Sequence, residues 1–415
     1  MDLPPFRWIT QRLSHDHLRD IPTAVRQQLA AVLPSFLPGQ QVAITAGSRG
    51  VTNIPIILRA ACEAVRAAGG EPFLVPAMGT HGGATAAGQV ELLASLGVTE
   101  ESVGAPIRSS MDVVVVGRTP RGTEVYMDRI ASEADAVLLV ERIKPHTDFT
   151  GRYESGLCKM MAIGLGKAAG ALRIHSLGSN GLRDEIPEVA RVMLAARPIV
   201  AGLAIIENAL GQTEQVVALR SHEILEREPA LLEQVKRHMA GFPFPEADIV
   251  LLDWVGKDIS GTAMDSKTVG RISIAGVADP ERPRIGCLAA LDLTDVSHGN
   301  ATGIGLADVT TERLARKVDM QALRINSMAS GFWQRAKMPM PLQNDAEVLQ
   351  TAIRVSGRPA SQMRICRARD TLHLERMVVS EPLLAQIDGD VEVGPPYQFA
   401  FDAEGNFADH KTFPD

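Results

Sequence analysis

The sequence predicts an α/β protein of two domains, each built on a mainly parallel sheet, with the active site in the cleft between the domains. Short apolar runs rich in Val, Ile and Leu alternate with helical patterns from residue 40 onward. Strands separated by helices favour parallel neighbours, because parallel strands need a crossover connection. The chain has 415 residues, enough for two domains. Polar loops follow several of the strands, and open α/β sheets bind ligands at that edge.

The first half of the chain carries a pattern of buried strands and amphipathic helices. The strand candidates are short apolar runs bounded by turn residues, and they lie at 41–45, 72–77, 112–116, 136–140 and 200–206. Two helices are expected between them, at 54–68 and 89–96. A charged amphipathic helix at 222–239 ends this half.

A Pro-rich joint, GFPFP at 241–245, is the candidate domain boundary, since Pro and Gly punctuate regular structure. The expected domains are therefore an N-terminal cofactor-binding domain at 1–243 and a C-terminal α/β domain at 244–400. In the second domain we expect strands at 249–253, 285–291 and 363–366 and a helix at 345–355. The polar segment 401–415 is expected to be a loosely held tail.

Composition excludes several classes of function. The net charge of −7 argues against a nucleic-acid-binding face, which needs clustered basic residues. No apolar stretch approaches the roughly 20 residues of a membrane span, and the N-terminus lacks the pattern of a signal peptide. The four cysteines are scattered and form no CxxC pair, so neither a disulfide framework nor a thiolate zinc site is indicated. We expect a cytoplasmic protein.

The first glycine loop follows the strand at 41–45 and reads AGSRGV. Ser48, Arg49 and Gly50 would open the next helix, and backbone amides at a helix N-terminus bind phosphate or carboxylate well. Arg49 would add a bidentate donor. The alternative is a simple strand-to-helix turn with a solvated arginine.

A second glycine motif, AIGLGKAAG at 162–170, only approximates a dinucleotide-binding fingerprint. Its last glycine is one place late. The acidic residue about 20 positions on, Asp184 or Glu185, lies at an expected helix start rather than at a strand end. Close helix packing is the favoured interpretation of these glycines.

Two polar loops of the second domain are candidate substrate-facing segments. WVGKDISGTAMD places Lys257, Asp258 and Ser260 after a hydrophobic strand, and DVSHGNATG contains His298 and Asn300. Polar, glycine-rich loops on a rigid scaffold often carry binding residues. An ordinary surface loop remains the alternative for each.

Three histidines and one lysine follow apolar runs or glycine-rich loops. These are His81 in PAMGTHGG, His146 in KPHTDF, Lys159 in GLCKMM, and His175, sixteen residues after the lysine. Any one of these histidines alone would more readily be structural. Together with Lys159 they favour an active site built around a cofactor or metal.

With these residues the sequence resembles the lactate racemase family, the nickel-pincer-nucleotide-dependent isomerases, in a subgroup distinct from lactate racemase itself. The similarity runs over most of the chain. It is carried by GSRGV, PAMGTHGG, KPHTDF, GLCKMMAIGLG through RIH, VGKDISGTAMD and DVSHGNATGIGLADVT.

The resemblance implies a cofactor, the Ni(II) complex of pyridinium-3,5-bisthiocarboxylic acid mononucleotide, and roles for single residues. Lys159 would bind it covalently as a thioamide and His175 would complete the nickel's square plane, while His81 and His146 would flank the substrate as the two proton-transfer groups. The remaining implied contacts are Ser48, Arg49, Gly50 and Gly156 for the cofactor, and Lys257, Asp258, Ser260, His298 and Asn300 for the substrate. Two departures stand out. The His146–Lys159 gap of thirteen residues is three longer than in lactate racemase, and Ala46 replaces an acidic residue.

The implied activity is that of an isomerase, a racemase or epimerase of a small 2-hydroxy acid. It would act by hydride removal and return through a keto acid, because the proton on the carbinol carbon is too weakly acidic to remove directly. Its partners would be the substrate and the cofactor-synthesis enzymes. One alternative is a nicotinamide-dependent 2-hydroxy acid dehydrogenase, which leaves Lys159 and two histidines unexplained. Another is a non-catalytic nickel- or nucleotide-binding protein. A hydrolytic zinc enzyme is disfavoured, since no HExxH pattern occurs.

Overall fold

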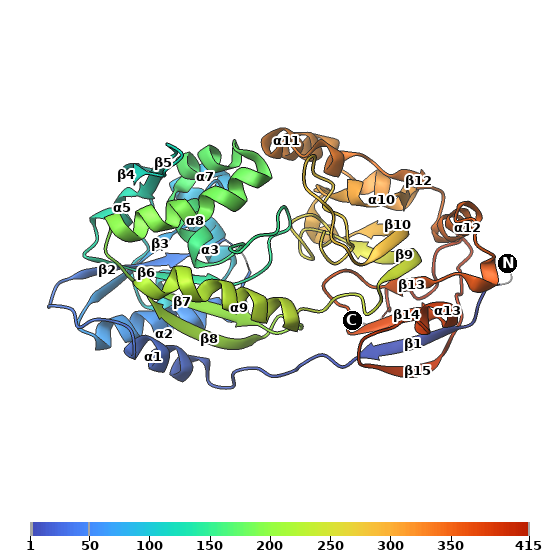
Figure 1. The fold of residues 1–415 in the computed structure, drawn as a ribbon, viewed down its shortest axis with the longest axis horizontal. Helices are drawn as coiled ribbons and strands as arrows, with labels where there is room; N and C mark the ends of the chain where they lie inside the picture. The colour runs from blue at the N-terminus through green and yellow to red at the C-terminus, as the bar shows by residue number, and fades with distance from the viewer. Residues whose placement is uncertain (1–2, 49, 414–415) are drawn as a thin grey trace. The chain divides into compact units, whose positions relative to one another are not determined.

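The computed structural model describes residues 3–48 and 50–413, which form two compact units (Figure 1). The continuous unit is Ser14–Met239, and the discontinuous unit joins Met1–Leu13 to Ala240–Asp415. The unit boundary after Met239 lies close to the expected one at 243. The structure differs from the expected division at the N-terminus, because residues 1–13 belong with the C-terminal half.

The continuous unit is a five-stranded sheet in the order β3-β2-β6-β7-β8. Its parallel strands are β2 (Gln41–Ala46), β3 (Glu71–Pro76), β6 (Ala136–Arg142) and β7 (Ile199–Glu207), and β8 (Thr213–Arg220) runs antiparallel to β7. The four parallel strands lie where the sequence pattern places them, and they confirm the α/β fold class for this unit.

Helices cover both faces of this sheet, because successive strand residues point to opposite sides. Val42 and Ile44 face one cluster, shared with α1 (Ile21–Ala30), α2 (Ile54–Ala67) and α3 (Ala86–Ser95). Ala43 faces the other, shared with α8 (Gly178–Ala196) and α9 (Ile224–His238). Shorter helical segments complete the unit: α4 (Glu100–Val103), α5 (Arg129–Glu133), α6 (Leu157–Lys159), the π-helix Met160–Leu165 and α7 (Lys167–His175).

The prediction of a buried strand at 112–116 is wrong: a strand forms there, but it is not buried and does not join the main sheet. These residues lie in β4 (Val113–Arg118), which pairs only with β5 (Glu124–Asp128) in a separate two-stranded antiparallel sheet. A short turn between the strands, with Gly122 at φ +81°, brings the chain straight back. None of the β4 residues is fully buried, so the run of valines reflects one face packed against α8 rather than a core strand.

The discontinuous unit has an eight-stranded sheet in the order β12-β11-β10-β9-β13-β14-β1-β15. The strands from β12 to β13 are parallel, and they include β9 (Glu246–Val255), β10 (Arg284–Leu293) and β13 (Ile365–Ala368), all expected from the sequence. The remaining three strands pair antiparallel and were not expected. They are β14 (Arg376–Ser380), β1 (Phe6–Gln11) and β15 (Val391–Tyr397).

The unit contains two further strands of this sheet and several helices. The expected helix is α12 (Asp345–Val355). The rest are β11 (Val309–Thr311), β12 (Met340–Leu342), α10 (Glu312–Lys317), α11 (Met320–Ser330) and α13 (Glu381–Leu384).

The expected loose tail at 401–415 is packed over its described residues. Phe407 and Phe413 are buried at 2% and 3% exposure. Asp409 accepts a 2.8 Å hydrogen bond from the buried Arg367 guanidinium, which also lies over both phenylalanine rings. His410 stacks on Trp254. The prediction of a loose tail is therefore wrong for the described residues, because this polar segment packs over the buried Arg367.

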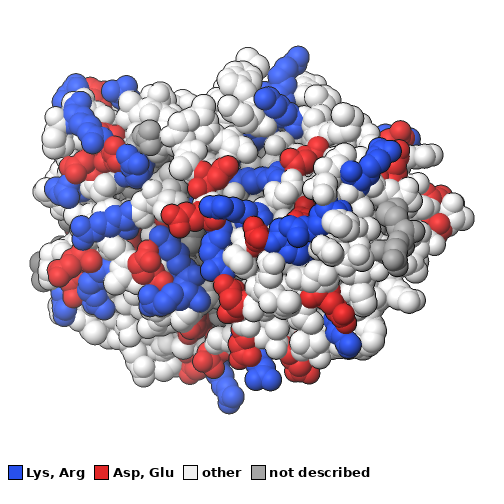
Figure 2. Space-filling view, turned by 45° about the vertical axis from the view of Figure 1, so that its right-hand side comes forward, with Lys and Arg blue, Asp and Glu red and all other residues white. Residues whose placement is uncertain are grey.

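The surface mixes both signs of charge. In Figure 2, Lys and Arg are interspersed with Asp and Glu over the face in view rather than gathered into a large patch of one sign. Among the described residues, no helix has the length and apolar character that crossing a bilayer requires.

Candidate active site

The carboxyl ends of three parallel strands bring the predicted residues of the continuous unit to one sheet edge. Ser48 follows β2, His81 follows β3 and His146 follows β6. The His81 ring nitrogen Nδ1 lies 2.5 Å from the Ser48 hydroxyl, so the first two loops meet directly. Arg49 lies outside the described residues. Gly50 is exposed, and a Cβ there would meet nothing within 4 Å.

The turn that carries His81 packs against the helix that carries His175. Gly79 has φ +60°, and a Cβ at Gly79 would lie 3.2 Å from both the Ala171 Cβ and the Ile163 Cγ2. Glycine is needed because this conformation and this close approach both exclude a side chain. The expectation of close packing is met at Gly164 too, where a Cβ would come within 3.0 Å of neighbouring atoms.

His146 is held by its own loop. Its backbone N–H donates to the Glu154 carboxylate at 2.6 Å, and its ring stacks on Phe149 with centroids 4.5 Å apart. The ring Nδ1 accepts the backbone N–H of Asp148 at 3.1 Å. In the neutral ring the proton therefore sits on Nε2, which makes Nε2–H the donor that His146 can offer.

Lys159 and His175 occupy one nearly continuous helical segment made of α6, the π-helix and α7. Lys159 lies one turn into this segment, with its Nζ 3.3 Å from the Ser155 hydroxyl, and His175 is the last residue of α7. The pKa of His175 is lowered, mainly because the surrounding protein desolvates the ring and also because the Lys159 charge lies nearby. The Asp148 carboxylate acts in the opposite direction. Lys159, His175 and Asp148 are thus electrostatic neighbours. Asp148 in turn binds His146.

The donor set fits the cofactor that the resemblance implies. A lysine amine is available for a covalent bond, and the lowered pKa favours the neutral form of His175, the form in which imidazole binds metals. Among the described residues, no group of three or more His, Cys, Asp or Glu side chains could hold a metal ion.

Gly156 opens this helical segment, and its lack of a side chain makes room for a buried carboxylate. A Cβ at Gly156 would lie 2.7 Å from the Glu228 Oε1. Glu228 comes from α9, is 1% exposed, and accepts the Cys158 backbone N–H at 2.9 Å. Glu228 thereby caps the turn that presents Lys159.

The predicted substrate loops of the discontinuous unit lie side by side after the parallel strands β9 and β10. The Lys257 backbone N–H donates to the Ser297 hydroxyl at 2.8 Å, and its Nζ donates to the carbonyls of Gly261 and Thr302. Asp258 accepts the Thr294 hydroxyl at 2.5 Å. The two loops therefore form one polar surface in this unit.

The other predicted substrate residues differ in accessibility. Ser260 is 8% exposed, with its hydroxyl 3.3 Å from the Thr262 hydroxyl. His298 is exposed and adopts a left-handed conformation with φ +46°. Asn300 accepts the Thr302 hydroxyl at 2.9 Å. The Ser260 side chain makes a contact within its own loop, whereas the exposed His298 side chain is accessible to a ligand.

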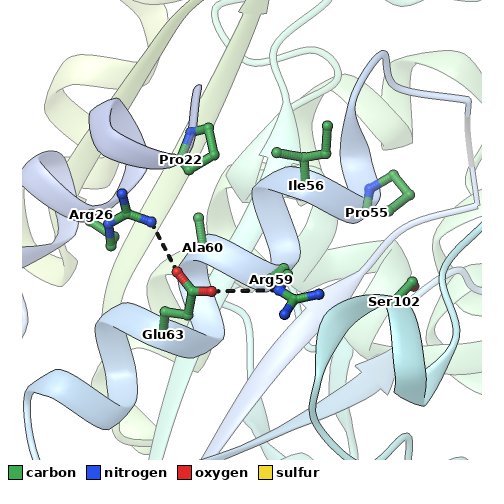
Figure 3. A pocket seen from close by; sticks show the side chains of 8 residues that line it. All are labelled: Pro22, Arg26, Pro55, Ile56, Arg59, Ala60, Glu63 and Ser102. Carbon is green, nitrogen blue, oxygen red and sulfur yellow. Dashed lines mark hydrogen bonds and ion pairs between the residues drawn. The ribbon is translucent and has the colours of Figure 1, made fainter. Parts of the chain in front are cut away.

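A cavity of about 460 Å³ lies away from these residues, between α1 and α2 (Figure 3). Its wall contains Arg26 and Arg59, and Figure 3 shows both reaching the same Glu63 carboxylate. A smaller one of about 250 Å³ lies beside Cys287. None of the predicted site residues lines either cavity.

Three acidic residues that contact the predicted site residues were missed by sequence reasoning. The Asp148 backbone N–H donates to the His146 ring, the Glu154 carboxylate accepts the His146 backbone N–H, and Glu228 caps the Lys159 turn. The first two lie within eight residues of His146, so their proximity was a usable signal. Glu228 lies in a charged helix pattern that gives no sign of its burial.

Residues 38–182 match the family described as the lactate racemase N-terminal domain. This segment of the chain is therefore a lactate racemase N-terminal domain. Ser48, His81, His146, Lys159 and His175 all lie within the matched lactate racemase segment. A domain of this kind suggests a racemase-type function.

The fold is shared with a solved structure, the lactate racemase apoprotein from Thermoanaerobacterium thermosaccharolyticum. The two agree with a TM-score of 0.53 at 12% sequence identity, over 88% of this chain and 94% of that chain. The match shows a lactate-racemase-like fold. The search of curated proteins found no match.

Proposed function

We propose that the protein is a racemase or epimerase of a 2-hydroxy acid that uses the nickel-pincer nucleotide. The observation that carries this proposal is that Lys159, His175 and the Asp148 of the His146 loop are electrostatic neighbours inside a lactate racemase N-terminal domain. A nicotinamide dehydrogenase is less well supported. The AIGLG segment is a π-helix rather than a strand-to-helix loop, and the buried Glu185 accepts the Thr119 hydroxyl from within α8.

Lys159 and His175 would hold the cofactor from two points of one helical segment, the first through a covalent thioamide and the second through nickel. Ser48 and the amides of its loop would bind the cofactor's phosphate, as helix N-termini do. When bound, the cofactor supplies a hydride acceptor, which is chemistry that no side chain provides.

His81 and His146 would exchange protons with the substrate hydroxyl. An imidazole can accept or return a hydroxyl proton near neutral pH. His146, with Nδ1 engaged by the Asp148 N–H, would present Nε2 to the substrate. His81 would shed or accept a proton while Nδ1 stays bonded to Ser48. One group would serve each face of a flat keto acid.

The polar loops of the discontinuous unit would hold the substrate carboxylate, with Lys257 and His298 as the charged or chargeable groups. Asp258 and Asn300 support these two loops through hydroxyl contacts.

Cofactor loading tests the first part of the proposal. Full-length protein co-produced with the cofactor-synthesis enzymes should contain nickel and should show a mass adduct on the Lys159 peptide. Lys159→Ala should lose the adduct and the activity, whereas Lys411→Ala, at an exposed position, should keep both. Full nickel content and activity in Lys159→Ala would refute covalent anchoring.

Isotopic labelling tests the reaction itself. Loaded enzyme should interconvert the stereoisomers of a 2-hydroxy acid from a substrate panel, and deuterium at carbon 2 should slow turnover and stay in the product. Imidazole is too weak a base to deprotonate an unactivated carbon. Loss of the label to water would refute the hydride route. A loaded protein with no turnover on any 2-hydroxy acid would favour the non-catalytic binding protein.

A further inference from the structure

A fully buried lysine lies behind the candidate site, and the proposed chemistry does not use it. Lys167 is 0% exposed and is the first residue of α7, the helix that ends at His175. Its Nζ donates to the Pro76 carbonyl at the end of β3 (2.8 Å) and to the Gln89 Oε1 in α3 (2.7 Å), and it forms an ion pair with Asp128 at 3.4 Å. Four separate segments therefore meet at one ammonium group.

Gln89 links Lys167 to the turn that carries His81. The Gln89 side chain is 0% exposed, and its Nε2 donates to the carbonyls of Gly79 (3.0 Å) and His81 (3.3 Å). An ammonium can only donate, so Lys167 fixes which end of the amide is the oxygen and directs both N–H groups at the turn. Lys167, Gln89 and the two carbonyls form an unbroken hydrogen-bonded chain.

The backbone at Lys167 has the strain common at functional positions. Its φ of +52° is left-handed, a conformation that is strained for any residue other than glycine. A glycine would relieve the strain but would lose the ammonium group. Burying a lysine and Asp128 also costs desolvation free energy, which apolar residues of similar volume would avoid. Stability alone does not account for the charged pair.

We propose that Lys167 and Gln89 are positioning residues that set the His81 turn against the helix carrying His175. The proposal rests on the proposed function, because it assumes that His81 must be placed relative to the site that His175 marks. A mispositioned catalytic group by about 1 Å can cost on the order of 10²-fold in rate. Because Lys167 binds both the His81 turn, through Gln89, and the helix that carries His175, it limits the movement of one relative to the other.

Gln89→Leu is the decisive variant, and the chain supplies a matched control. Gln11 in the discontinuous unit is also buried, and its Nε2 likewise donates to two backbone carbonyls, those of Gly241 and Leu374. Gln11→Leu therefore removes a comparable clamp elsewhere. If Gln89 positions His81, only Gln89→Leu should lower kcat, by about 10²-fold with little change in KM.

Two measurements on the full-length chain without cofactor separate this inference from the proposed function. Hydrogen exchange should accelerate at the turn amides of His81, Ala84 and Thr85, which are hydrogen-bonded within the turn. The ring nitrogen NMR shifts of His81 should also move, because its bond to Ser48 depends on the turn. Gln11→Leu should change neither. Both readouts hold even if the protein acts on no 2-hydroxy acid.

The double variant Asp128→Asn/Lys167→Met guards against a Gln89 variant that fails to fold. It removes the buried charges together, so no unpaired carboxylate remains, and it frees the Gln89 amide. It should reproduce the faster exchange of the turn and the His81 shift change. Wild-type exchange and wild-type His81 shifts in either folded variant would overturn the proposal.

Discussion

Glu228 is a carboxyl group with almost no access to water, placed beside the turn that presents Lys159. Burial raises its pKa to about 7, although the hydrogen bonds from the Cys158 amide and thiol and from the Leu157 amide act in the opposite direction. Oε1 has no hydrogen-bond partner among the described residues. The ionised form of Glu228 is thus costly in the folded state.

Stability should therefore fall as the pH rises from about 5 to about 8. The folded-state pKa of Glu228 lies above the unfolded value of 4.5, so its contribution is fully present below pH 4.5 and is lost through pH 7. Glu228→Gln removes this loss, which is on the order of 3 kcal/mol. Denaturant unfolding at both pH values should show the variant gaining stability relative to wild type as pH rises.

The control is Glu226→Gln, an exposed carboxylate on the same helix. It should change the free energy of unfolding by less than about 0.5 kcal/mol at either pH. An identical pH dependence in wild type and Glu228→Gln would show that Glu228 stays ionised at little cost.

The two candidate proton-transfer histidines should be needed in both reaction directions. His81→Ala or His146→Ala should lower turnover of the loaded enzyme by about 10²-fold or more each way, the usual scale of general acid–base catalysis. Initial rates from each stereoisomer provide the measurement. His17→Ala, at an exposed position of the same unit, should leave both rates unchanged. Wild-type rates in either active-site variant would contradict the assignment.

Sequence reasoning found the residues that could do chemistry but not those that hold them. His81, His146, Lys159 and His175 stood out because each follows an apolar run or a glycine loop. Gln89 and Lys167 lie in helical patterns, where a polar residue ordinarily faces solvent. Their burial follows from long-range packing between β3, α3 and α7, which periodicity does not encode.

At the scale of elements, the π-helix between Lys159 and His175 is tightly packed at Gly164. A Cβ at Gly164 would lie 2.6 Å from the Met160 Sδ and 2.7 Å from the Ala77 carbonyl oxygen. The backbone carbonyl cannot move without shifting the loop that leads to His81. The spacing of Lys159 and His175, the two proposed cofactor anchors, thus depends on a position without a side chain.

Gly164→Ala should destabilise the protein by about 1–3 kcal/mol, the usual cost of overpacking, and should lower the fraction of protein that acquires the Lys159 adduct. Thermal unfolding and intact mass measure the two effects. Gly241→Ala is the control, because a Cβ at Gly241 meets nothing within 4 Å. Unchanged stability and loading in Gly164→Ala would mean that the helix adjusts freely.

Parallel strands were predictable and antiparallel additions were not, for a physical reason. A strand such as 136–140 is buried on both faces and gives a continuous apolar run. In contrast, β15 has the sequence VEVGPPY and β1 has FRWITQ, which mix polar residues or proline into the pattern. The error at β4 was the reverse. Its run of valines has the pattern of a core strand, although β4 pairs only with β5 and is not buried.

At the scale of the whole molecule, the first strand of the chain belongs to the unit formed by the last residues. Ile9 in β1 is 0% exposed and lies opposite Met377 in β14 and Val393 in β15. Ile9→Ala should cost about 2–5 kcal/mol by leaving a cavity. Hydrogen exchange should speed up in Arg376–Ser380 while the strands of the continuous unit keep their protection.

The matched control is Leu37→Ala, at a side chain that is 71% exposed in the continuous unit. It should leave exchange in both units unchanged. Equal loss of protection in both units of Ile9→Ala would mean that the molecule unfolds as a single cooperative body.

The placement of β1 also sets an order of events on the ribosome. Domains made first during synthesis generally fold first, so the residues from Ser14 to Met239 can close while the strand before them has no partner. Phe6–Gln11 must wait as an unpaired strand until β14 and β15 have been translated near the other end of the chain. Exposed strand edges invite pairing with other chains. Newly made molecules therefore pass through a period in which Phe6–Gln11 is exposed to pairing with other chains.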